Sequence, residues 1–218
     1  MLIELETSAV IFDLDGVLVD SSAVVDQTWI EWSKRHGLDA GMVLRTIPGK
    51  RTRDAVLLLA PDSDIDAETA RIMAREESLV ELAVPIPGAA ALLAQLPAGR
   101  WGIATSGTNP IARSRLAHAG LDAPEVFITA EMVSRGKPHP EVYTHAARAL
   151  GFDAAQCVVF EDAPSGVASA TAAGSTVVGV LTWAEAALLG AAYAVQDLRA
   201  VRPGRRGSTI LLGLHDES

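Results

Sequence analysis

The chain has 218 residues, 49% hydrophobic and 21% charged, a composition that excludes wholesale disorder and fits one sizeable core with a smaller second unit. The formal net charge of -9 argues against nucleic acid as the main partner, because phosphate backbones favour basic surfaces. The single cysteine, Cys157, excludes a disulfide within the chain, and no apolar stretch reaches the length of a membrane span.

The first predicted element is a strand over residues 9–13, whose β-branched and aromatic residues are typical of a buried parallel strand. It runs into Asp13-Leu14-Asp15-Gly16, where Gly16 allows the chain to turn. The two aspartates leave the carboxyl end of the strand on one side, where open α/β sheets bind ligands. Carboxylates this close repel each other and require a metal ion, a shared proton or a strong cation. By itself the pattern also fits a loop that binds Ca²⁺ or Mg²⁺.

The next part of the chain, residues 20–85, has no convincing strand. Its apolar spacing predicts amphipathic helices over residues 23–36, 52–59 and 66–82. Pro85-Ile86-Pro87-Gly88 has the composition of a hinge. We therefore predict a helical domain over residues 20–85, inserted into a core domain formed by residues 1–19 and 86–218.

The remaining chain alternates strands and helices, which favours a doubly wound, Rossmann-like parallel sheet of the α/β class. Strands are predicted over residues 101–105, 126–129, 158–161, 176–180 and 192–195. Helices are predicted over residues 89–96, 110–119, 140–150 and 164–173, several of which open with proline in the favoured first turn. Residues 202–207 are interpreted as a solvated loop that leads to an edge strand over residues 209–214, and Cys157 as a small buried hydrophobe at the start of a strand.

Three further motifs follow predicted strands or loops of this sheet. Thr105-Ser106-Gly107-Thr108 precedes a helix, and hydroxyls with free N–H groups at a helix start form a phosphate cradle, although the same residues are ordinary caps. Lys137 is flanked by Gly136 and Pro138, a setting that suits a cation aimed at one point. Glu161 and Asp162 end another buried strand, so four carboxylates meet at one sheet edge, where Mg²⁺ is the natural occupant.

The ordered set Asp13-x-Asp15, Thr105-Ser106, Lys137 and Glu161-Asp162 resembles the four motifs of the haloacid dehalogenase-like hydrolase superfamily, with the inserted helices in the place of its C1 cap. Within it, the stretches around these motifs, together with Arg51-Thr52-x-Asp54-Ala55, resemble sugar and polyol phosphatases of the glycerol-3-phosphatase and 2-deoxyglucose-6-phosphatase type. Val17 and the pair Ser134-Arg135 depart from the common pattern, which leaves the subfamily and the substrate open.

The resemblance implies a Mg²⁺-dependent phosphomonoester hydrolase that acts on a small phosphorylated metabolite. Asp13 would be the nucleophile that forms an aspartyl-phosphate, and Asp15 the general acid and then the base for water. Mg²⁺ would be held by Asp13, by the backbone carbonyl of Asp15 and by Asp162, with Glu161 either a direct ligand or one step removed from the ion. Lys137, Thr105 and Ser106 would bind the phosphoryl oxygens.

Substrate specificity is assigned to the helical domain, where Lys50-Arg51-x-Arg53-Asp54 forms a cationic run. Arg51 and Asp54 are the residues predicted to contact substrate, although a solvated helix start fits this run equally well. Trp29 and Trp32 lie three residues apart and are interpreted as core of the helical domain rather than as a platform for the substrate.

Rival functions differ at particular residues. Asp15 argues against a dehalogenase, whose halide leaves unprotonated, and against a phosphonatase, whose first motif has alanine there. A β-phosphoglucomutase-like mutase shares the first motif and the final acidic pair but carries a histidine where this chain has Val25. A receiver-type signalling domain has no helical insertion, and a non-catalytic regulatory member of the fold would lose at least one of the motif residues.

The expected cellular setting follows from absent signals. We find no export signal and expect a cytoplasmic protein without nucleic-acid or membrane partners. No coiled-coil pattern or long apolar stripe is present, so we expect a monomer.

Overall fold

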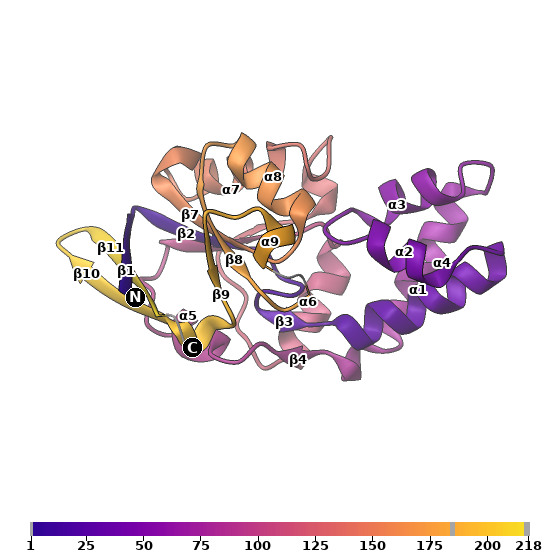
Figure 1. Ribbon diagram of the computed structural model, residues 1–218, viewed down its shortest axis with the longest axis horizontal. Coiled ribbons are helices and arrows are strands. Elements are labelled where there is room, and N and C mark those ends of the chain that lie inside the picture. Colours follow the sequence, from indigo (N-terminus) through magenta and orange to yellow (C-terminus); the bar gives the residue numbers. More distant parts are fainter. Residues whose placement is uncertain (1, 184–185, 216–218) are drawn as a thin grey trace.

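The structure is a computed structural model that describes residues 2–183 and 186–215. Its centre is a six-stranded parallel sheet in the order β6-β5-β2-β7-β8-β9 (Figure 1). The strands are β2 (Ala9–Phe12), β5 (Trp101–Ala104), β6 (Val126–Ile128), β7 (Cys157–Glu161), β8 (Thr176–Val180) and β9 (Tyr193–Val195). This is the predicted doubly wound α/β core, and every predicted strand of the parallel sheet is present to within two residues.

Helices cover both faces of this sheet. They are α5 (Ala89–Leu93), α6 (Asn109–His118), α7 (Glu141–Ala149), α8 (Pro164–Ala172) and α9 (Ala186–Leu189). Because side chains alternate along a strand, Val10 and Phe12 pack with α5 and α6, whereas Ala9 and Ile11 pack with α7 and α8. Strand β2 is therefore buried on both faces, which explains its continuous apolar run. Cys157 is also buried, as predicted.

A second sheet corrects the prediction for the end of the chain. Strands β1 (Leu2–Thr7), β11 (Thr209–His215) and β10 (Val201–Arg206) form a three-stranded antiparallel sheet in that order. The loop predicted for residues 202–207 is wrong, because these residues pair with β11 through a turn at Gly207, whose φ is 62°. The strand predicted over residues 209–214 exists but is the central one, and Pro203 is tolerated because β10 is an edge.

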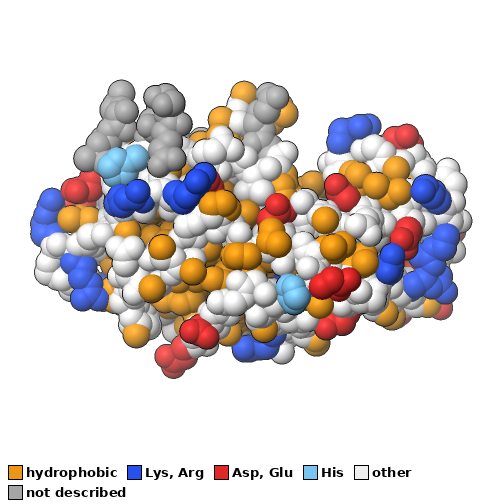
Figure 2. Space-filling model, turned by 90° about the horizontal axis from the view of Figure 1, so that it is seen from below, with side chains coloured by type: hydrophobic (Ala, Val, Ile, Leu, Met, Phe, Trp, Pro, Cys, Tyr) orange, Lys and Arg blue, Asp and Glu red, His pale blue; other side chains and the backbone are white. Residues whose placement is uncertain are grey.

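A separate group of helices lies at the right of Figure 1, and we call it the helical unit (residues 22–77). It consists of α1 (Ser22–His36), α2 (Ala40–Thr46), α3 (Thr52–Leu59) and α4 (Ile65–Glu77), packed around its own apolar cluster. The chain enters it through β3 (Val19–Asp20) and leaves through β4 (Val84–Pro85), which pair in antiparallel fashion. Figure 2 shows basic and acidic side chains interspersed at this end of the molecule.

Two details of the helical unit differ from the prediction. Helix α2 was not predicted, although Asp39 caps it by accepting a hydrogen bond of 2.7 Å from the backbone N–H of Met42. The helix predicted over residues 66–82 ends at Glu77, and a short 3₁₀ turn follows over Val80–Leu82. None of the helices in the described part of the chain combines the length and apolar character needed to cross a membrane.

Candidate active site

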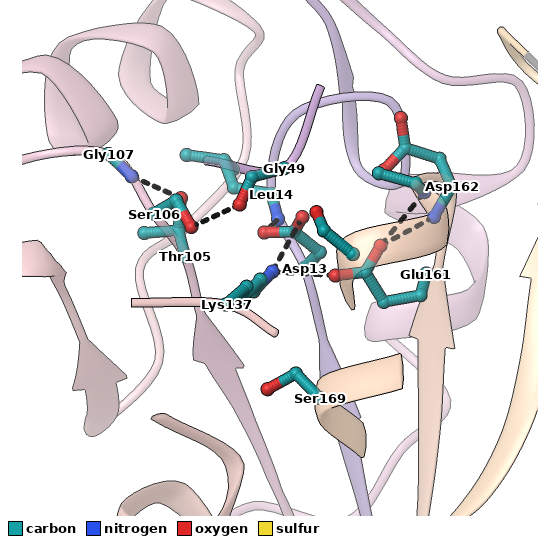
Figure 3. A network of polar contacts seen from close by, with 12 residues as sticks. Asp13, Leu14, Gly49, Thr105, Ser106, Gly107, Lys137, Glu161, Asp162 and Ser169 are labelled. Atoms are coloured by element: carbon teal, nitrogen blue, oxygen red, sulfur yellow. Dashed lines mark hydrogen bonds and ion pairs between the residues drawn. The ribbon is translucent and has the colours of Figure 1, made fainter. Parts of the chain in front are cut away.

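The candidate site lies where β2, β5 and β7 end. Phe12 pairs with Ile103 on one side and with Phe160 on the other, so the residues that follow these strands emerge at the same edge. Asp13 follows β2, Thr105 follows β5, and Glu161 is the last residue of β7, with Asp162 directly after it. Figure 3 shows Asp13 and Glu161 beside Lys137, which comes from the loop before α7, with Thr105 and Asp162 on either side of them. The structure thus brings together five of the residues predicted for the site.

Lys137 is the cation at the centre of this group. Its Nζ lies 2.9 Å from Asp13 Oδ2 and 2.6 Å from Glu161 Oε1, and the lysine side chain is 1% exposed. Burial by itself would lower the pKa of Lys137, but the charges of Asp13 and Glu161 outweigh it and hold this pKa above its usual value. The charged form of the ammonium group is therefore favoured, and the group lies against Asp13.

Glu161 is fully occupied by protein donors. Its Oε1 accepts from Lys137 Nζ and from Tyr143 Oη at 2.7 Å, and its Oε2 accepts from the backbone N–H groups of Asp162 and Ala163 at 2.9 and 3.0 Å. Burial alone would raise the pKa of Glu161, but Lys137 and these hydrogen bonds hold it below its ordinary value. Gly166 makes room for the carboxylate, because a Cβ there would lie 1.6 Å from Oε1.

Asp13 and Asp162 have the opposite electrostatic balance. Burial raises the pKa of Asp13 to about 7, although Lys137 opposes the shift. Burial, followed by the charges of Glu161 and Asp13, raises the pKa of Asp162 well above its usual value. Gly16, with φ 76°, admits this carboxylate, since a Cβ there would lie 2.0 Å from Asp162 Oδ2.

Carboxylate oxygens of Asp13, Glu161 and Asp162 lie within 4.8 Å of one another, close enough to surround one metal ion. A dication beside Asp13 and Asp162 would favour their ionised forms and offset their raised pKa values. Hard oxygen donors of this kind fit Mg²⁺. Because the oxygens of Glu161 already accept four hydrogen bonds, Asp13 and Asp162 are the better placed ligands.

The hydroxyl residues after β5 lie beside this cluster, at the start of α6. Thr105 is buried, and its Oγ1 accepts from the backbone N–H of Gly107 at 3.0 Å. Ser106 Oγ donates to the backbone carbonyl of Gly49 at 2.7 Å, a contact between the core and the helical unit (Figure 3). Both residues line one cavity together with Asp13, Asp15 and Asp162.

This cavity is closed on its far side by the helical unit. Its wall includes Val25 and Trp29 of α1, Leu44 of α2 with Ile47 just after it, and Thr52 of α3 with Lys50 just before it. Trp29 and Trp32 both belong to the apolar cluster of the helical unit, as predicted, and Trp29 also lines the cavity.

Arg51 and Asp54 do not line this cavity. Arg51 Nε donates to Asp54 Oδ2 at 2.6 Å, and its NH1 donates to the backbone carbonyl of Val133 at 3.1 Å. A Cβ at Gly136 would lie 2.8 Å from both side chains, so the pair packs closely against the loop that carries Lys137. In this structure the pair joins the helical unit to the core, and the substrate contact predicted for it stays a prediction.

Asp15 has a partner that the sequence reasoning missed. Its Oδ1 accepts from Ser21 Oγ at 2.7 Å and from Arg115 NH1 at 2.7 Å. Arg115 lies on α6, is 4% exposed and lines the cavity. It stands four residues after buried Ile111, on the apolar face of the helix, and an arginine in that position is the signal that could have revealed it.

The comparisons with known proteins agree with this geometry. The family model described as "haloacid dehalogenase-like hydrolase" matches residues 7–174, and the chain belongs to this family. Over 175 residues the chain is 47% identical to hexitol phosphatase A of Escherichia coli, an alignment that covers 78% of this chain and 81% of that protein. It is 35% identical to glycerol-1-phosphate phosphohydrolase 2 of Saccharomyces cerevisiae, covering 83% and 77% of the two chains.

A solved structure extends the similarity to the fold. A hydrolase of the same family from Deinococcus radiodurans was solved with bound phosphate and sodium. It superimposes on this chain with a TM-score of 0.67 at 34% sequence identity, and the match covers 88% of this chain and 92% of the Deinococcus chain.

Proposed function

We propose that this chain is a Mg²⁺-dependent phosphatase of small sugar or polyol phosphates that works through an aspartyl-phosphate. The observation that carries the proposal is the buried cluster in which Asp13 faces Lys137 and Asp162 at the sheet edge. Relatives that are named phosphatases of hexitol and glycerol phosphates support the substrate class.

Asp13 is the proposed nucleophile. Its Oδ1 accepts from the backbone N–H of Leu14 at 2.7 Å and its Oδ2 from Lys137, so the carboxylate is held in one orientation. One of its oxygens attacks phosphorus while the bond from phosphorus to the ester oxygen breaks. Lys137 and donors of the Thr105-Ser106 segment offset charge on the transferring group.

Asp15 is the proposed acid and base. It gives a proton to the departing ester oxygen, and its carboxylate then takes a proton from the water that attacks the phosphorus of the acyl phosphate. That second attack releases phosphate and restores Asp13. The side chains of Asp13 and Asp162, with the backbone carbonyl of Asp15, would hold Mg²⁺, which neutralises charge between nucleophile and phosphate.

The helical unit is proposed to act as the cap domain, spanning residues 20–85 between core segments 1–19 and 86–218. Its residues close the cavity over the position of the leaving group, which excludes water from the reaction. Val25 places an apolar side chain in that wall and offers no group for returning a phosphoryl group to a second position. This favours hydrolysis over the mutase alternative.

The test is phosphate release from hexitol, glycerol and hexose phosphates, measured with Mg²⁺, with EDTA and with the Asp13→Asn variant. We expect release that requires Mg²⁺ and is lost in the variant. Conversion of a hexose 1-phosphate to the 6-phosphate without phosphate release would overturn hydrolysis in favour of a mutase. The cytoplasmic location and the monomeric state stay predictions from the sequence.

A further inference from the structure

Arg115 connects the proposed general acid to the helical unit. Its NH1 donates to Asp15 Oδ1 at 2.7 Å, and its NH2 donates to Glu76 Oε2 at 3.1 Å. Arg115 belongs to α6 of the core, whereas Glu76 belongs to the last turn of α4 in the helical unit, and the two helices pack against each other. All three residues line the cavity.

Stability alone is a poor explanation for this connection. The side chains of Arg115 and Glu76 are 5% and 7% exposed, so both charges have lost most of their water. Buried ion pairs of this kind rarely add net stability compared with apolar residues of the same size. Arg115 Nε is also buried and has no hydrogen-bond partner among the described residues, which adds a further cost. A costly buried arginine that touches an active-site carboxylate points to function.

The contacts also determine which oxygen of Asp15 faces the chemistry. Ser21 Oγ and Arg115 NH1 both donate to Oδ1, and no hydrogen bond to Oδ2 is found among the described residues. Two donors on one oxygen fix the rotation of the carboxyl group and leave Oδ2 as the atom that exchanges the proton with the leaving group. Without Arg115, Ser21 would be the one remaining donor and the carboxyl group could turn.

Resting on the proposed function, we propose that Arg115 is a positioning residue that orients Asp15 for proton transfer when Glu76 of the helical unit is docked. The guanidinium suits this task because its two terminal nitrogens reach two separate carboxylates in a fixed geometry. In a lysine all donors are on one nitrogen, whereas here each carboxylate is held by a different nitrogen of Arg115. The arrangement makes acid catalysis depend on a closed helical unit, since α4 must be in place for Glu76 to hold Arg115.

The inference predicts a dependence on the leaving group. Phenyl phosphate and 4-nitrophenyl phosphate have similar shapes, but phenolate is a much stronger base than 4-nitrophenolate and needs the proton from Asp15 far more. In Arg115→Lys we expect kcat for phenyl phosphate to fall by at least about tenfold and kcat for 4-nitrophenyl phosphate by less than about threefold. Glu76→Gln, which keeps the shape of the side chain, should also lower kcat for phenyl phosphate more than kcat for 4-nitrophenyl phosphate, but by a smaller factor than Arg115→Lys.

A matched control is available on the same two helices. Ser114 Oγ on α6 donates to Glu77 Oε1 on α4 at 2.8 Å, an exposed contact between core and helical unit that does not touch Asp15. If docking of the helical unit were all that mattered, Ser114→Ala would act like the Arg115 and Glu76 variants. We expect it to leave the ratio of the two rates unchanged.

The outcomes separate the hypotheses. Equal losses on both esters in Arg115→Lys and Glu76→Gln would show a structural role and overturn the inference, as would unchanged rates in both variants. If Arg115→Lys does not fold, as judged by its thermal unfolding, Glu76→Gln alone decides between these results. If the wild type hydrolyses neither ester nor any sugar phosphate, the proposed function fails and the inference falls with it.

Discussion

Buried carboxylates in the helical unit and in the core have opposite balances between burial and nearby donors. Glu68 of the helical unit accepts from Trp32 Nε1 at 2.8 Å and contacts His36 Nε2 at 3.1 Å and Arg71 NH1 at 2.5 Å. Burial by itself would raise the pKa of Glu68, but these donors outweigh it and hold the pKa below its usual value. Asp13 and Asp162 of the core share Lys137 as their nearby cation, and burial raises the pKa of both.

On the proposed function, the difference separates a structural carboxylate from a catalytic one. A carboxylate whose donors are all supplied by the protein stabilises the fold in which those donors meet. A pair of carboxylates with too little positive charge costs stability and is ready for a cation or an electrophile. We therefore expect loss of Glu68 to reduce stability, and loss of Asp13 or Asp162 to reduce activity.

The largest expected effect is on catalysis in Asp13→Asn. Loss of the proposed nucleophile should lower kcat/KM by at least about 10⁴-fold. In metal-free protein the folded pKa of Asp13 is about 7 against an ordinary 3.8, so the folded state binds more protons between these values and stability falls as the pH rises through them. At pH 8 in EDTA the variant should therefore unfold at a temperature no lower than that of the wild type. A marked loss of stability would mean that Asp13 is structural.

Mg²⁺ should have the next largest effect, on stability as well as activity. At 100 times its dissociation constant, the ion should raise the free energy of unfolding by about 2.7 kcal/mol. Because Asp13 must lose its proton to bind the ion, apparent affinity should fall as the pH drops below about 7. Titration calorimetry in two buffers of different protonation enthalpy measures both affinity and proton release. Asp162→Asn should abolish the effect, whereas Asp122→Asn, an exposed residue, should keep it.

Glu68→Gln should do the reverse and reduce stability with little effect on rate. We expect a loss of about 1–2 kcal/mol in the free energy of unfolding and a kcat within about twofold of the wild type. Since the folded pKa of Glu68 is lowered, its contribution is present above the unfolded value of 4.5 and is lost as the pH falls through the folded value. The gap between variant and wild type, measured by urea unfolding, should therefore close in acid. Glu31→Gln, at an exposed ion pair with Arg75, is the control and should change little.

The sequence predicts the core sheet well because the information needed there is local. The apolar runs of β2, β5 and β7 each end in polar residues, and parallel strands necessarily bring their carboxyl ends to one edge. That reasoning places Asp13, Thr105 and Glu161 beside one another without knowledge of any contact.

Long-range contacts account for most of what the sequence does not predict. Strand β10 contains Pro203 and Gly204, which indicate a loop, and it is a strand because β11 pairs with it and with β1 from the other end of the chain. The burial of Arg115 depends on Asp15, a hundred residues earlier, and on Glu76. The spacing from Ile111 indicates that Arg115 is buried, but its two carboxylate partners follow only from tertiary contacts.

The smallest expected effect is that of Tyr143→Phe, a variant that tests whether Glu161 holds Lys137 in place. Tyr143 is fully buried and donates to Glu161 Oε1, the same oxygen that binds Lys137 Nζ. Tyr143→Phe removes that hydroxyl but keeps the ring packed against α7's apolar neighbours, so we expect a loss of about 1 kcal/mol in the free energy of unfolding. With one donor gone, Glu161 is less firmly oriented and Lys137 is free to shift relative to Asp13.

Such a shift should lower kcat by about threefold to tenfold with little change in KM, because the proposed role of Lys137 is to offset charge that develops during phosphoryl transfer. Steady-state kinetics on one hexitol phosphate, together with thermal unfolding, measures both effects. Thr144→Val is the neighbouring control, because its hydroxyl donates to backbone carbonyls of its own helix and not to the site. An unchanged kcat in Tyr143→Phe would mean that the backbone N–H groups of Asp162 and Ala163 suffice to hold Glu161, and that the buried phenol contributes to packing alone.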